Sequence, residues 1–111
     1  MEGLIMLDKS LFYISQELVE KKAVLADGKE HTLHFKEIGS IEFSAIAVKL
    51  SSEDAIDRVQ GMADMVVASL CNPDGTKALT LEEMPMMKHK VLTNLFNAAI
   101  SVQKGSVEGK D

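Results

Sequence analysis

Two histidines spaced three residues apart, His31 and His34, are the first side chains in this chain that could bind a metal ion. They lie in the stretch EKKAVLADGKEHTLHF, where an Asp-Gly pair between two short runs is typical of a β-hairpin. In a strand, residues three apart point to opposite faces, so one ion could not easily bridge both imidazoles. The chain has no second cysteine and no His-Glu-x-x-His motif. We therefore interpret the histidines as polar hairpin positions and expect no metal and no cofactor.

The single cysteine, Cys71, is the only candidate for a reactive thiol. A reactive thiol needs a neighbour that lowers its pKa, and only Lys77, across a turn, is suitably placed in the sequence. Cys71 follows Leu70 at the end of an apolar stripe, where a free cysteine behaves as a small hydrophobic residue. We therefore expect Cys71 to pack at the end of a helix and not to react.

The remaining polar motifs do not predict catalysis. Asp74-Gly75 could begin a calcium loop, but the third and fifth positions of that loop would be Thr76 and Ala78. The carboxylates at Glu53, Asp54, Asp57, Glu82 and Glu83 fall at expected helix starts, where they cap the helix or interact with its dipole. There is no glycine-rich phosphate loop and no Gly-x-Ser-x-Gly. We expect a protein that is not an enzyme and has no small-molecule substrate.

Methionine is the unusual feature of the composition, with seven residues, three of them around Pro85. Because methionine is flexible and polarizable, it lines adaptable binding surfaces and also fills irregular cores. Both interpretations stay open. The candidate partner-binding residues are Met84, Met86, Met87 and Met65.

The net charge of −5 argues against direct binding of nucleic acid, which usually requires a basic face. A single cysteine cannot form an internal disulfide, so nothing indicates an oxidising compartment. The first residues, MEGLIMLDKS, lack a basic region and a cleavage site, and no apolar run approaches the length of a membrane span. We expect a cytoplasmic protein without a signal peptide that does not bind membranes.

The hydrophobic pattern predicts a mainly α (α+β) domain. A short amphipathic helix over Asp8–Val19, capped by Asp8, precedes a β-hairpin at about 20–36. A three-residue loop, Asp27-Gly28-Lys29, would place Ala23, Leu25, Leu33 and Phe35 on one face, whereas a two-residue loop would scatter them. Both registers stay open.

Three to four packed helices follow the hairpin, at about 41–50, 53–71, 81–84 and 86–103. Ser40 and Ser51 are the expected N-caps of the first two, and Thr80 with Glu83 has the pattern of a capping box. Gly61, inside the second helix, either allows another helix to approach or is simply tolerated. We expect one globular domain over residues 1–103 and a flexible tail over 104–111, which lacks apolar periodicity.

The order of these segments resembles the tail assembly chaperones of long-tailed bacteriophages and prophages, from about Asp8 to Gln103. The strand pair VEKKAVLADGKEHTLHFKEI is followed by the helix EFSAIAVKLSS, by MADMVVASLCNPDGTKALTLEE and by VLTNLFNAAISVQ. The most telling run is Ala68-Ser69-Leu70-Cys71, followed by Asp74-Gly75 and Leu79-Thr80.

The resemblance implies a non-catalytic protein that binds and solubilises the tape measure protein during tail morphogenesis, in the host cytoplasm, and is absent from the mature virion. It also implies self-association. A frameshifted longer form would recruit the tail tube protein, and this chain would be the short form; Gly109-Lys110 is compatible with a slippery codon pair. The alternative is a small helical adaptor or regulatory protein that acts as a dimer.

Overall fold

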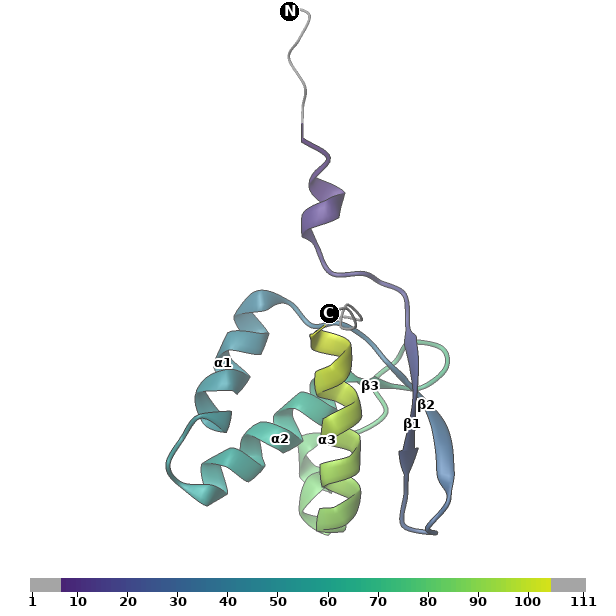
Figure 1. The fold of residues 1–111 in the computed structure, drawn as a ribbon, viewed down its shortest axis with the longest axis vertical. Coiled ribbons are helices and arrows are strands. Elements are labelled where there is room, and N and C mark those ends of the chain that lie inside the picture. Colours follow the sequence, from purple (N-terminus) through teal and green to yellow (C-terminus); the bar gives the residue numbers. More distant parts are fainter. Residues whose placement is uncertain (1–6, 105–111) are drawn as a thin grey trace, which may run out of the picture.

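A computed structural model describes residues 7–104 and shows an α+β fold (Figure 1). The prediction of a mainly α fold is therefore wrong. Helices contain 52% of the residues and strands 15%, and the strands form a three-stranded antiparallel sheet in the order β1-β2-β3. The elements are η1 (Lys9–Phe12), β1 (Val19–Val24), β2 (Glu30–Phe35), α1 (Ser40–Leu50), α2 (Ala55–Ser69), β3 (Leu70–Cys71), η2 (Leu81–Met86) and α3 (His89–Gln103), of which η1 and η2 are 3-10 helices.

The hairpin closes with a three-residue loop. This loop begins one residue earlier than Asp27-Gly28-Lys29, the three-residue loop considered from the sequence. Val24 pairs with Glu30, and the loop is Ala26–Gly28, closed by a hydrogen bond from the Leu25 N–H to the Lys29 carbonyl. Gly28 has a φ of 77°, a left-handed conformation that favours glycine. This register places one set of apolar side chains on the inner face: Val19, Ala23, Leu25, Leu33 and Phe35.

The third strand was not predicted, because it has only two residues and therefore no periodicity of its own. The helix expected over 53–71 ends at Ser69, and Leu70 turns to an extended conformation with ψ of 130°. Leu70 then pairs with Phe35, and Cys71 pairs with His34. The edge of β2 offers backbone hydrogen bonds to Leu70 and Cys71, and pairing with β2 is more favourable there than two further residues of helix.

The helix starts differ from the expected caps by one to three residues. Gly39 is the N-cap of α1, so Ser40 is already helical, and Asp54 caps α2 in place of Ser51 by accepting the Ile56 N–H at 2.9 Å. The predicted capping box is confirmed, with a carboxylate oxygen of Glu83 accepting the backbone N–H of Thr80 at 2.8 Å.

The core lies where α2 and α3 pack together and where the sheet meets α3 (Figure 1). Phe35, Met65, Val66 and Ala99 are fully shielded from solvent at its centre. α1 packs against α2 through Gly61, where an added Cβ would lie only 3.0 Å from Lys49 Cβ. The glycine therefore allows the close approach of the two helices.

Residues 7–16, which we call the arm, extend away from this body (Figure 1). The helix predicted over Asp8–Val19 is wrong: only Lys9–Phe12 form a single 3-10 turn, and Val19 already belongs to β1. Asp8 does cap that turn, accepting the Ser10 N–H at 3.2 Å. No residue of η1 is buried, and a short helix without packing is marginal in water. The tail predicted over 104–111 lies outside the described residues except for Lys104, which caps α3.

Candidate functional site

A groove runs along the outer side of α2, and we call it the α2 groove. Three adjoining hollows that share Leu81 form it, and the one lined by Val59, Met84 and Pro85 has a volume of about 430 Å³. Its floor is formed by Val59, Ala63 and Val67 of α2, one wall by Ala45 and Lys49 of α1, and the other wall by Ala78, Leu81, Met84 and Pro85.

The floor follows from residue spacing on α2. Val59, Ala63 and Val67 recur every four residues, so they share one face of the helix. That face lies beside the one that packs into the core through Met65 and Val66. Val59 consequently keeps 38% of its surface exposed. α2 thus presents more apolar surface than the body of the protein covers.

The opposite wall is held by local structure in η2. The capping box between Thr80 and Glu83 fixes the start of the turn, and Met84 anchors it in the core with 8% exposure. Leu81 is left projecting and is 55% exposed. Its side chain lines all three hollows, so it stands at the middle of the groove.

The charged groups at the groove are of both signs, with carboxylates in excess. Lys49 Nζ lies 2.6 Å from a carboxylate oxygen of Asp64, and this ion pair joins α1 to α2 along one wall. Lys77, Glu82 and Glu83 line the hollow on the other side, and Glu42 lines the hollow beside α1. A groove with an apolar floor and a carboxylate rim suits an apolar helix better than an anionic small molecule.

The structure separates the four candidate methionines. Met65 and Met84 are buried in the core, with 0% and 8% exposure, and of the four only Met84 lines the groove. Met87 is half-buried and packs against the core, while Met86 is 89% exposed. The sequence reasoning missed Val59 and Leu81. The available signal was that Ile56, Val59, Ala63 and Val67 widen the apolar stripe of α2 beyond one buried face.

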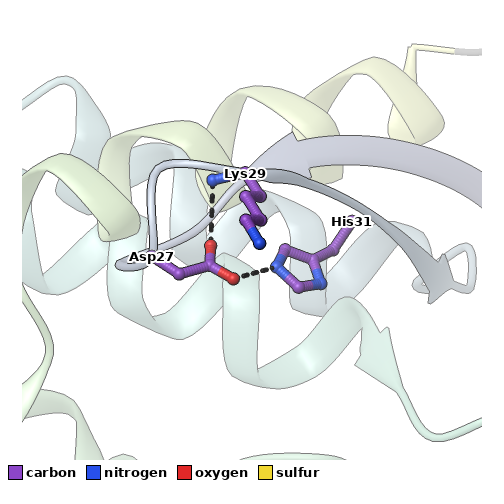
Figure 2. Close-up of polar contacts among 3 residues, drawn as sticks. All are labelled: Asp27, Lys29 and His31. Atoms are coloured by element: carbon purple, nitrogen blue, oxygen red, sulfur yellow. Dashed lines mark hydrogen bonds and ion pairs between the residues drawn. The ribbon is translucent and has the colours of Figure 1, made fainter.

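The two histidines lie on opposite faces of β2. His31 Nε2 lies 2.8 Å from Asp27 Oδ2 at the hairpin turn, where Asp27 Oδ1 also accepts the Lys29 N–H at 2.9 Å (Figure 2). Those two contacts, the backbone one first, hold the pKa of Asp27 below its usual value. Their contribution to stability is therefore present above the unfolded pKa and is lost as the pH falls through the lower folded value. His34 instead lies 3.5 Å from Glu20.

Cys71 and the turn after it have structural roles. The thiol is buried and directed at the Ser69 carbonyl, 3.4 Å away, and burial raises its pKa although Lys36 and Lys77 act in the opposite direction. Asp74 accepts hydrogen bonds from the hydroxyl of Thr76 at 2.6 Å and from its N–H at 3.0 Å, and both lower the pKa of Asp74. These contacts close the predicted turn.

Comparison of the chain with protein-family models, with curated proteins and with solved structures gives no match. Over residues 7–104, the structure shows no cluster of three or more histidine, cysteine or acidic side chains that could hold a metal ion. The same part of the chain has no helix with the length and apolar character of a membrane span. The α2 groove is an apolar hollow of the described residues that could bind another molecule.

Proposed function

We propose that this protein is a tail assembly chaperone that holds apolar helices of the tape measure protein in the α2 groove. The family is suggested by the resemblance of the sequence, above all by Ala68-Ser69-Leu70-Cys71 with the turn that follows. The observation that carries the binding role is the exposed apolar groove formed by α2, α1 and η2.

The groove has dimensions and chemistry that suit a helix. From Val59 to Val67 the floor spans two turns of α2, about 12 Å at 1.5 Å per residue. A client helix with apolar residues at every third or fourth position would cover that length with two or three side chains. Met84 lies at one end, where its buried side chain holds the groove wall in place.

The groove also supports binding that is reversible and broad. Its exposed apolar side chains are few, chiefly Val59 and Leu81, so a single site can contribute only modest affinity. A tape measure protein offers many similar helical segments, so several chaperones could cover it at once. The net charge of −5 keeps the free chaperone soluble and keeps coated clients apart.

The remaining expectations belong to the same proposal. The protein acts in the cytoplasm of the bacterial host and leaves before the virion matures, and a frameshifted longer form binds the tail tube protein. An adaptor or regulator acting as a dimer would use the same groove for one defined soluble partner. Light scattering separates the two, because a dimer that does not change with concentration and forms no larger assembly would favour the adaptor.

The direct test is co-expression with the tape measure protein of the same phage or prophage. Wild-type protein should keep the tape measure protein in the supernatant, and the double substitution Val59→Asp with Leu81→Asp should move most of it to the pellet. The matched control is Val48→Asp on α1, which is 73% exposed and does not line the groove. Circular dichroism checks that each variant is folded. A groove variant that solubilises the client as well as the wild type would contradict the proposal.

A further inference from the structure

More carboxylates than ammonium groups border the α2 groove. The charged side chains that line its three hollows are four acidic residues and two lysines, namely Glu42, Asp64, Glu82 and Glu83 against Lys49 and Lys77. Asp64 and Lys49 form the ion pair between α1 and α2, with 2.6 Å between their charged atoms. The groove therefore keeps three carboxylates against the single ammonium group of Lys77.

Two of these carboxylates are exposed and unpaired within residues 7–104. Glu83 takes part in the capping box, where it accepts the Thr80 N–H at 2.8 Å. Glu42 and Glu82 are exposed and belong to none of the ion pairs found in that part of the chain. We call Glu42 and Glu82 the acidic rim. Their charges are available to a bound molecule.

The acidic rim occupies both walls of the groove. Glu42, Ala45 and Lys49 share one face of α1 and line the same hollow. Glu82 lines the adjoining hollow on the side of η2. Val67 lies on the floor of both hollows. A helix lying on this apolar floor thus has a carboxylate on each side of it.

The chemistry that complements this arrangement is a basic amphipathic helix. The residues directly before and after an apolar stripe residue lie about 100° to either side of it, so long basic side chains there extend toward the two walls. An exposed ion pair strengthens binding only about two- to fivefold. Two such pairs give roughly tenfold, which matters because the exposed apolar side chains of the groove are few.

We infer that the α2 groove selects helices whose apolar stripe is flanked on both sides by lysine or arginine, and that it disfavours helices with acidic flanks. The inference rests on the proposed function for the identity of the client, since the helices selected are those of the tape measure protein. Charge complementarity of this kind contributes specificity and a faster encounter more than raw affinity. The acidic rim thereby decides which parts of a long client are covered first.

Three synthetic peptides and the full-length protein test the inference. The peptides have the same apolar stripe and carry lysine, glutamine or glutamate at the flanking positions, three residues of similar helix propensity. Fluorescence anisotropy at about 0.05 M salt should show the lysine peptide binding roughly tenfold more tightly than the glutamine peptide, and the glutamate peptide binding most weakly. About 1 M salt, where the screening length is about 3 Å, should remove the difference.

A pair of protein variants separates the acidic rim from the overall negative charge. Glu42→Gln with Glu82→Gln leaves Lys77 balanced by Glu83, so the preference for the lysine peptide should fall to less than about threefold. The matched control, Glu17→Gln with Glu30→Gln, has the same net charge but changes exposed residues that do not line the groove. The control should keep the full preference, and circular dichroism checks that both variants are folded.

Three outcomes would overturn the inference. The first is equal binding of the lysine and glutamine peptides at low salt, which would leave a groove that accepts apolar helices whatever their charge. The second is an equal loss of preference in both double variants, which would assign it to the net charge of the chain. The third is the absence of binding by all three peptides. The measurement uses no tape measure protein, so it can succeed while the solubility test fails, and the reverse also holds.

Discussion

The junction where β2, α2 and α3 meet and the N-terminal arm both contain large apolar side chains, but in opposite environments. At the junction, Phe35 is completely buried and a polar network ties the three elements together. In the arm, Phe12 keeps 66% of its surface in water. The difference teaches that an apolar pattern becomes stable structure only where another element covers it, since helix propensity alone contributes little in a short segment.

Hydrogen bonds of the polar network hold the three elements of the junction in one arrangement. Gln103 donates to the Lys36 carbonyl at 2.9 Å and accepts the Ile38 N–H, also at 2.9 Å. Ser69, fully buried, donates its hydroxyl to the same Lys36 carbonyl at 2.9 Å. The ends of α2 and α3 are thereby fixed to the chain that leaves β2. The arm has one comparable tether, the contact between Ser15 and Glu37.

Truncating a phenylalanine in each region gives the largest expected contrast. Phe35→Ala removes a fully buried ring and should lower the free energy of unfolding by about 3–5 kcal/mol, measured by urea denaturation. Phe12→Ala, the same change in the arm, should stay within about 0.5 kcal/mol of the wild type. Similar losses for both would mean that the arm packs against its own domain.

The methionines allow the same comparison at η2. Met84→Ala leaves a cavity in the core and should cost about 2–5 kcal/mol, whereas Met86 is 89% exposed and its substitution by alanine should cost less than about 0.5 kcal/mol. Thermal denaturation of the two variants measures the difference. If Met84→Ala unfolds like the wild type, η2 is not anchored in the core and the groove wall is not fixed.

The polar network should contribute less than the apolar core around it. Gln103→Leu leaves the Ile38 N–H without its partner and should cost about 1–3 kcal/mol in the free energy of unfolding. Gln60→Leu, the same substitution at an exposed position on α2, is the control and should be nearly neutral. A neutral Gln103→Leu would show that the junction depends on apolar packing alone.

The smallest expected effect concerns α1, which packs on α2 at Gly61. Gly61→Ala would bring a methyl group within 3.0 Å of Lys49 Cβ, and such overpacking costs about 1–3 kcal/mol. The higher helix propensity of alanine offsets up to about 1 kcal/mol, leaving a net loss of about 1 kcal/mol in a thermal melt. Gln60→Ala tests the neighbouring exposed position. A stabilised Gly61→Ala variant would argue against close contact of the helices.

Much of the fold was predictable because its signals are local. The Asp27-Gly28 pair marked the hairpin, Thr80 and Glu83 marked the start of η2, and the period of three to four marked α2 and α3. Of the two registers left open, the hairpin has the inner face expected for a three-residue loop, although the loop begins one residue earlier, because the strand pairing then moves by two residues and the same side chains share a face. The sequence therefore predicts a helix, strand or turn wherever a short stretch contains the complete pattern for it.

The candidate site was only partly predictable, because it depends on contacts between residues that are distant in the sequence. The sequence marked the neighbourhood of Pro85, and Met84 and Pro85 do line the groove. It could not separate buried Met84 from exposed Met86, two residues apart, because the 3-10 turn and its packing decide which one enters the core. Val59 and Leu81 are far apart in the sequence and share a hollow only after η2 folds back on α2.

The sequence by itself determined the hairpin, the helical periods, the capping box and the absence of any recognisable catalytic motif, since each depends on neighbouring residues. Tertiary structure alone decided that Leu70-Cys71 form a strand, that Asp8–Val19 form no more than the single turn η1, and that α2 has an exposed apolar side. The physical reason is the same in all three cases. Extended, helical and exposed states of a short segment differ by little free energy until a distant surface covers the segment or leaves it in water.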